Sequence, residues 1–150
     1  MDSHLRGQVV VVTGASGGIG SAIARKFAAE GARLVLQYHR GRTRIGELQK
    51  ELCATDPLIV QADLTSENET KRLFGRSVKR FGRVDTLIAN AGSWESREVP
   101  LDQMPLRQWQ RTLESVLTTT FLKCTRIPAA RSQTKARQCG ADCFNRSGLW

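Results

Sequence analysis

A glycine-rich segment near the start of this 150-residue chain is the feature that most restricts its fold. Residues 13–20 read T-G-A-S-G-G-I-G, directly after the apolar run Val9–Val12 and directly before apolar residues with helical spacing. In a strand, glycine loop and helix of this order, the free N–H groups of the helix N-terminus can face an anion. Glycine permits the tight turn and the close approach that such a loop requires. The segment therefore predicts a phosphate-binding turn in an α/β domain.

Strand and helix patterns alternate along the first 127 residues. Apolar runs predict strands over 9–12, 34–38, 58–60 and 84–89. Helical spacing predicts helices after the glycine loop and over 43–53, 66–82 and 105–127. The first helix should carry Ile19, Ile23 and Phe27 on one face, and the last should direct Trp109, Leu113, Val116 and Phe121 inward. This alternation predicts a doubly wound, Rossmann-type parallel sheet with helices on both faces.

The pattern ends after Ile127. Residues 128–150 contain neither a strand-like apolar run nor a sustained helical period, and we expect an irregular tail there. We therefore divide the chain into a domain over 1–127 and a tail over 128–150. No candidate exists for a fifth strand, so the predicted sheet is incomplete at its C-terminus. The abrupt change favours a shifted reading frame, a retained intron or a truncated gene model as the origin of the tail.

Charge and composition argue against several classes of partner. The net charge of +9 is spread as an excess of three positive charges in each of residues 1–60, 61–127 and 128–150. A nucleic-acid surface would more often concentrate that charge, so we expect no nucleic-acid partner. No apolar run is long enough for a membrane span, and the N-terminus lacks a signal-peptide pattern, which predicts a cytoplasmic protein. The four cysteines (Cys53, Cys124, Cys139 and Cys143) lack zinc-site spacing, so we expect no metal.

Two further short motifs follow predicted strands. Asp63-Leu64 comes after the third strand, and Asn90-Ala91-Gly92 comes after the fourth. Together with the T-G-x-x-x-G-x-G spacing of residues 13–20, these motifs resemble the short-chain dehydrogenase/reductase family, particularly its 3-oxoacyl-reductase-like members. The resemblance extends from about Leu5 to Ile127. It implies an oxidoreductase that uses a nicotinamide dinucleotide to reduce carbonyls or oxidise alcohols.

The resemblance also implies roles for individual residues. Asp63 would receive the adenine amino group, and the segment from Asn90 would line the cofactor and steady the sheet. Ser16 can offer a hydroxyl to phosphate. Taken singly, Asp63 can instead cap the next helix, and Asn90 can be a turn residue. The full set of predicted cofactor-binding residues is Thr13, Gly14, Ser16, Gly18, Ile19, Gly20, Tyr38, Arg40, Arg42, Asp63, Leu64, Asn90, Ala91 and Gly92.

The end of the second predicted strand bears on the choice of cofactor. An acidic residue there would bind the free ribose 2′-hydroxyl of NAD. The stretch Gln37–Arg44 contains no acid, and Arg40 and Arg42 can pair with a 2′-phosphate instead. We therefore expect NADP(H) to be preferred over NAD(H).

The catalytic residues of the family have no counterpart in these 150 residues. The family uses a tyrosine acid, a lysine four residues later and an upstream serine, but the only tyrosine here is Tyr38. Val116 stands where many members have a relay asparagine, and we interpret it as a core residue. We expect a catalytically incomplete chain that keeps the cofactor site; the alternative is a non-catalytic NADP(H)-binding sensor or interaction module. A small carbonyl or alcohol substrate and a homo-oligomer are expected only of a complete family member.

Overall fold

A computed structural model describes residues 4–92 and 99–125 of the chain. Four strands, β1 (Val9–Val12), β2 (Arg33–Tyr38), β3 (Leu58–Gln61) and β4 (Thr86–Ile88), form one parallel sheet in the order β3-β2-β1-β4. This order confirms the predicted Rossmann-type arrangement, in which the chain crosses from β3 to the far side of β1. In the described part of the chain, β4 is an edge strand.

Strand β1 lies inside the sheet and is covered on both faces. Val10 pairs in register with Leu34 of β2 and with Thr86 of β4. The four valines of β1 are at most 1% exposed. A strand covered on both faces needs apolar residues at every position, which explains the uninterrupted valine run.

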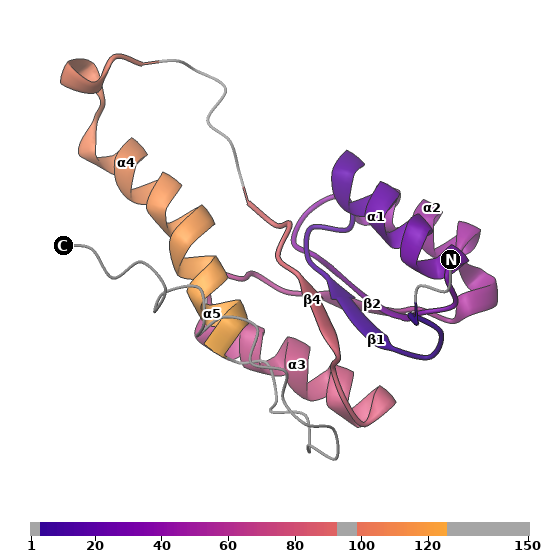
Figure 1. Cartoon of the computed structure of the whole chain (residues 1–150). Coiled ribbons are helices and arrows are strands. Elements are labelled where there is room, and N and C mark those ends of the chain that lie inside the picture. The colour runs from indigo at the N-terminus through magenta and orange to yellow at the C-terminus, as the bar shows by residue number, and fades with distance from the viewer. Residues whose placement is uncertain (1–3, 93–98, 126–150) are drawn as a thin grey trace, which may run out of the picture.

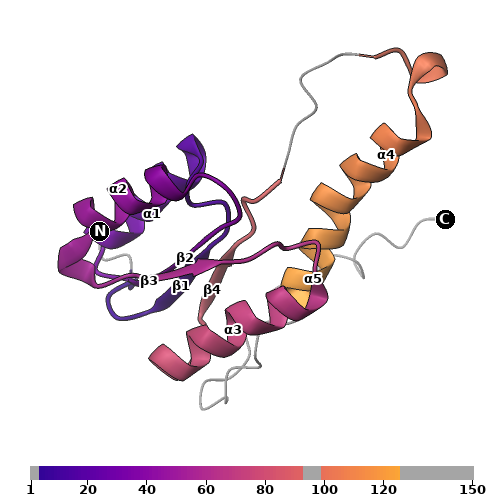
Figure 2. The ribbon, with the colours of Figure 1, turned by 180° about the vertical axis from the view of Figure 1, so that it is seen from behind.

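Helices cover the two faces of the sheet (Figures 1 and 2). Helices α1 (Gly18–Ala29) and α2 (Arg42–Glu51) lie on one face, and a short 3₁₀ turn (Cys53–Thr55) follows α2. Helix α3 (Glu67–Phe81) lies on the other face. Each face has its own apolar core, with Leu34 and Leu36 of β2 in the first and Val35 of the same strand in the second.

Helix α3 begins where the capping pattern predicts. The Ser66 hydroxyl accepts a hydrogen bond from Glu69 N. The reciprocal half of the capping box differs from the usual one, because the Glu69 carboxylate accepts from Asp63 N at 2.7 Å instead of from Ser66 N. Glu69 therefore fixes the loop that precedes the helix as well as its first turn.

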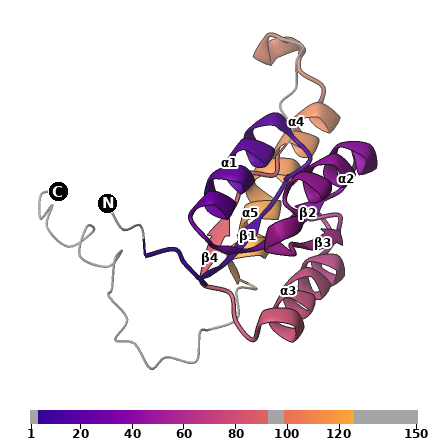
Figure 3. The same cartoon turned by 90° about the vertical axis from the view of Figure 1, so that its right-hand side faces the viewer.

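Of the helix predicted over 105–127, the described residues 106–125 are helical, but the winding changes in the middle. After a 3₁₀ turn (Leu101–Gln103), helix α4 (Leu106–Leu113) continues through a π-helical turn (Glu114–Thr118) into α5 (Thr119–Thr125). Helix α4 extends away from the sheet, whereas α5 lies beside α3 (Figures 1 and 3). A π turn accommodates an extra residue and is often found at functional sites.

The prediction that the apolar side of this helix faces inward is wrong. Trp109, Val116 and Phe121 are 49%, 44% and 65% exposed, respectively, and Leu113 is only half-buried. The side facing the sheet carries the buried residues Thr119 and Lys123 instead. Helical spacing identifies the apolar face but not what covers it, and the described sheet ends at β4. Ile19 of α1 is likewise exposed (72%), although Ile23 and Phe27 pack on the core.

Other predictions fall on residues outside the described ranges. These are the irregular tail over 128–150 and the cysteines Cys139 and Cys143. Among the helices of the described residues, none has the length and apolar character needed to cross a membrane.

Candidate nucleotide-binding site

A pocket of about 730 Å³ lies at the carboxyl ends of the strands. This is the place where ligands bind in open parallel α/β sheets, next to the strand at which the order reverses. Its walls come from the glycine loop, the ends of β2, β3 and β4, and the helix α4–α5. The lining residues are Gly14, Ser16, Gly17, Gly18, Ile19, Gly20, Gln37, His39, Arg40, Asp63, Leu64, Thr65, Asn90, Ala91, Gly92, Arg111, Ser115 and Thr119.

The structure brings most of the predicted cofactor-binding residues together in this pocket. Those in the lining are Gly14, Ser16, Gly18, Ile19, Gly20, Arg40, Asp63, Leu64, Asn90, Ala91 and Gly92. Three others lie outside the lining. Thr13 is fully buried behind the loop, Tyr38 belongs to the core on the α1–α2 face, and Arg42 is exposed in the first turn of α2.

The glycine loop is tightly packed on one side and open on the other. Gly14 has a φ of +66°, a backbone conformation that residues other than glycine rarely adopt. A Cβ on Gly20 would lie 2.3 Å from Gly14 O, so only glycine allows helix and loop to approach this closely. A Cβ on Gly18 would meet no atom within 4 Å. Gly18 therefore borders the open space in which a phosphate group can lie.

The N-terminus of α1 suits an anion. Within the described residues, no side chain caps this helix at Gly17, and its first turn contains no acidic residue. The first N–H groups of a helix lack intrahelical partners and carry a partial positive charge. Together with the space at Gly18, this end of α1 fits the pyrophosphate of a dinucleotide.

Thr13 and Asn90 join the glycine loop to the end of β4. The Asn90 side-chain amide donates to Thr13 O at 2.9 Å, and Ala91 N donates to the Thr13 hydroxyl at 3.0 Å. The same hydroxyl donates to Ile88 O at 2.9 Å. The Asn90 hydrogen bond links the end of β4 to the end of β1, in line with the role in the sheet that the family resemblance implies. Thr13 makes its hydrogen bonds from a buried position behind the pocket wall.

Asp63 is held as a carboxylate at the end of β3. Its Oδ1 accepts hydrogen bonds from the Thr65 backbone N–H at 3.0 Å and the Thr65 hydroxyl at 2.7 Å. These bonds lower the pKa of Asp63, and the nearby His39 and Arg40 act in the same direction. The His39 ring nitrogen is 3.8 Å from Oδ2. An ionised Asp63 can accept a hydrogen bond from an amino group such as that of adenine.

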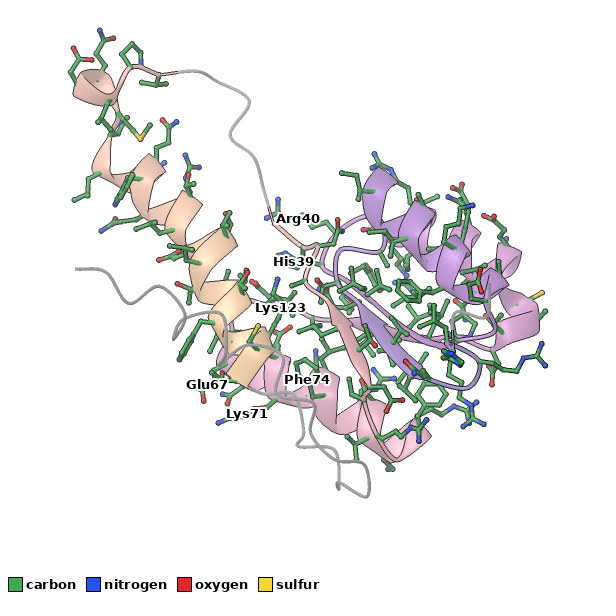
Figure 4. All side chains as sticks on the ribbon, viewed as in Figure 1. His39, Arg40, Glu67, Lys71, Phe74 and Lys123 are labelled. Atoms are coloured by element: carbon green, nitrogen blue, oxygen red, sulfur yellow. The ribbon has the colours of Figure 1, made fainter. Side chains whose placement is uncertain are left out.

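Arg40 and the glycine loop are tied together by Ser16. The Ser16 hydroxyl donates to Arg40 O at 2.9 Å. Since a hydroxyl has a single proton, this bond occupies the donor that we expected Ser16 to offer to phosphate. Figure 4 shows His39 and Arg40 next to each other beyond the end of β2.

The sequence interpretation missed Lys123 and seven residues of the pocket lining, which are Gly17, Gln37, His39, Thr65, Arg111, Ser115 and Thr119. Gln37 is 1% exposed, and a polar residue inside the apolar run 34–38 was the signal that could have identified it. Ser115 and Thr119 share one side of the helix through the π turn, and the Thr119 hydroxyl donates to Ser115 O at 2.8 Å. The apolar residues of that helix lie on its other side, and the predicted inward face was based on them.

Lys123 is a charged side chain buried in α5. Its ammonium donates to Ala91 O at 3.2 Å, and the side chain has no exposed surface. Burial lowers the pKa of Lys123. Figure 4 shows it on the part of α5 that lies beside the sheet. Lys123 thereby connects α5 to the segment from Asn90 that lines the pocket.

Comparisons with known proteins agree with this arrangement. Residues 8–137 match the family model described as short chain dehydrogenase. A 3-oxoacyl-[acyl-carrier-protein] reductase from Synechocystis sp. is 36% identical over 124 residues, which cover 81% of this chain and 49% of that protein.

Two solved structures share the fold. A blue fluorescent protein from a metagenomic library, in complex with NADPH, aligns with a TM-score of 0.76 and 30% identity over 85% of this chain and 53% of its own. A short chain dehydrogenase from Burkholderia cenocepacia, in complex with NADP, aligns with a TM-score of 0.74 and 28% identity over 83% and 51%. The chain thus spans about half the length of these relatives. From the matched residues and the shared fold, this chain belongs to the short-chain dehydrogenase/reductase family of oxidoreductases.

Proposed function

We propose that this chain is the cofactor-binding part of a short-chain oxidoreductase and binds NADP(H) in preference to NAD(H). The observation that carries the proposal is the position of Arg40 in the pocket lining at the end of β2, where an acid would favour NAD. In this arrangement the α1 N-terminus holds the pyrophosphate, Asp63 accepts from the adenine, and Arg40 pairs with the 2′-phosphate. When bound, NADPH would supply the hydride for carbonyl reduction in a complete family member.

Further support for NADP(H) comes from the surroundings of Arg40. The first turn of α2 contains Arg42 and Arg44 and no acidic residue. His39, also in the lining, adds a ring N–H that can donate to a phosphate oxygen. A phosphate dianion gains more from this surrounding than a neutral hydroxyl does. The two structural relatives described above were solved with NADPH and NADP.

Titration of the purified chain with NADPH and NADH tests the proposal. We expect the dissociation constant for NADPH to be lower by about ten-fold or more, because a charge-assisted pair contributes roughly 1.5–3 kcal/mol. Arg40→Ala should remove this preference and leave NADH affinity unchanged. Arg33→Ala, at the opposite end of β2, is the matched control and should alter neither affinity. Equal affinity of the original chain for both cofactors would contradict the preference.

We propose in addition that these 150 residues do not reduce carbonyls by themselves. Tyr38 is the only tyrosine and is buried in the core, and no Tyr-x-x-x-Lys pattern exists in the sequence. Positioned acid and base groups contribute on the order of 10² to 10⁴ in rate. The same observation favours the second candidate, an NADP(H)-binding module without chemistry of its own.

An activity assay separates cofactor binding from catalysis. NADPH consumption by the chain should not exceed background with a panel of small ketones, aldehydes and 3-oxoacyl thioesters. A turnover of about 1 per second, ordinary for enzymes, would contradict the proposed inactivity. NADPH binding without turnover would support both parts of the proposal.

A further inference from the structure

Gln37 is a buried polar side chain near the carboxyl end of β2, at the edge of the pocket that it helps to line. It lies in β2 with 1% of its surface exposed, between the core residues Leu36 and Tyr38. A buried amide destabilises a fold unless both its donor and its acceptor find partners. Gln37 satisfies this condition at both ends, and the two partners come from different segments of the pocket.

The oxygen of Gln37 contacts the glycine loop. Gln37 Oε1 accepts from Gly14 N at 2.9 Å, at the residue whose positive φ begins the loop. The next residue, Ala15, donates its N–H to the Gln37 backbone carbonyl at 2.9 Å. Two successive peptide units of the loop are therefore oriented by one residue of β2.

The nitrogen of Gln37 contacts the segment on the other side. Gln37 Nε2 donates to Ala62 O at 2.7 Å, and Ala62 directly precedes Asp63. Ala62 N in turn donates to Tyr38 O at 2.9 Å. The side-chain amide thus forms a bridge across the end of β2, from the phosphate-binding loop to the residue we assign to adenine.

We propose that Gln37 is a positioning residue of the nucleotide site. It holds the glycine loop at a fixed separation from Asp63, so that one dinucleotide reaches both. The inference rests on the proposed function, because the two segments need this alignment only if the same ligand contacts them. The residue type follows from the geometry: one end must accept from an N–H and the other must donate to a carbonyl. A glutamine side chain does both, whereas an ionised glutamate and a methionine do not.

Two ligands distinguish positioning from general stabilisation. NADPH needs the loop and the Asp63 segment together, whereas adenosine 2′-monophosphate lacks the pyrophosphate and needs only the adenosine end. We expect Gln37→Met to weaken NADPH binding by about ten-fold or more, because the glycine loop and the Asp63 segment lose the bridge that holds them in alignment before the ligand binds. Binding of adenosine 2′-monophosphate should weaken much less. Gln49→Met, at an exposed position of α2, is the matched control and should leave both affinities unchanged.

Gln37→Glu supplies a second test that does not depend on the Met variant folding. The ionised carboxylate still accepts from Gly14 N but faces Ala62 O with a second acceptor. Burial raises the pKa of an introduced carboxyl group, and the protonated form can donate to that carbonyl. The NADPH affinity of this variant, relative to the original chain, should therefore recover as the pH is lowered from 8 towards 5.5.

The outcomes separate the two proposals. If the original chain binds NADPH and Gln37→Met weakens both ligands equally, or neither, the positioning role is overturned and the proposed function stands. If Gln37→Glu shows no relative recovery at low pH, the bridge to Ala62 is overturned. If the original chain binds neither ligand, the proposed function fails, and the positioning role fails with it.

Discussion

The ammonium group of Lys123 lies 3.2 Å from the carbonyl oxygen of Ala91, with no exposed surface on the lysine side chain. Lys123 belongs to α5, and Ala91 belongs to the pocket-lining segment that follows β4. A single hydrogen bond therefore links the last described helix to the wall of the cofactor site. The group that makes this bond is an ionisable ammonium whose pKa is lowered by burial.

We expect the stability of the chain to respond to this buried charge at high pH. Because burial lowers the pKa of Lys123 below its ordinary value of 10.5, the unfolded chain binds the proton more readily in the interval between the two values. The stability cost of the buried charge is present below the folded pKa and disappears as the pH rises to 10.5. The free energy of unfolding of the original chain should therefore rise relative to that of Lys123→Met over this interval.

Chemical denaturation of both proteins at a series of pH values measures this difference. Lys71→Met is the matched control, because Lys71 is half-exposed on α3 and paired with Glu67 at 2.9 Å. The stability difference between the original chain and the control should not rise above pH 8, because the Lys71 ammonium is paired and not buried. A difference between the original chain and Lys123→Met that does not rise either would contradict the account of the buried charge.

Gly18→Ala should separate cofactor binding from folding. A Cβ at this position meets no protein atom within 4 Å but projects beside the space assigned to phosphate. We expect a melting temperature that does not fall and an NADPH affinity lower by about ten-fold or more, because the backbone must approach the pyrophosphate closely. Differential scanning fluorimetry and a binding titration measure the two effects.

Gly75→Ala serves as the control for that substitution. Gly75 is exposed in α3, and a Cβ there also meets nothing within 4 Å. Alanine in a helix interior is more favourable than glycine by about 0.5–1 kcal/mol, so the melting temperature should rise. Its NADPH affinity should not change. Equal NADPH affinities of the Gly18 and Gly75 variants would show that Gly18 does not border the phosphate site.

Asp63→Asn should reduce stability in a pH-dependent manner. The two Thr65 hydrogen bonds lower the pKa of Asp63 below its ordinary value of 3.8. Such a carboxylate stabilises the fold above pH 3.8, and this stabilisation is lost as the pH falls through the folded pKa. Unfolding experiments between pH 7 and pH 2 should therefore show the variant less stable at neutral pH, with the difference shrinking in acid. A difference that is independent of pH would show that the charge of Asp63 does not contribute.

Ser66→Ala should destabilise the chain by about 1 kcal/mol, the usual effect of removing an N-cap side chain. The Ser66 hydroxyl is the acceptor for Glu69 N at the start of α3. Thr112→Ala is the control, because Thr112 is an exposed residue within α4 whose hydroxyl donates to its own helix. Urea unfolding of both variants measures the effect. Equal stabilities of the two variants would contradict the role of the cap.

Much of the fold could be predicted from the sequence because the signals are local. The valine run of β1, the capping serine of α3 and the spacing of apolar residues in α2 each depend on neighbours within a few positions in the chain. The ordered motifs at residues 13–20, 63–64 and 90–92 also predicted most of the pocket lining. Parallel strands bring such motifs to one edge of the sheet whatever the details of packing.

The sequence by itself thus determined the parallel α/β architecture, the glycine loop and the family, since these follow from short-range patterns and their order. Only the tertiary structure decided which side of the helix from α4 to α5 is covered. Lys123 of α5 is buried, whereas Trp109 of α4 is exposed. The tertiary structure also decided that Gln37 joins Gly14 to Ala62, residues 48 positions apart in the chain. The spacing of apolar residues shows which side of a helix or strand is apolar. Burial and hydrogen-bond partners depend instead on the other elements that pack against it.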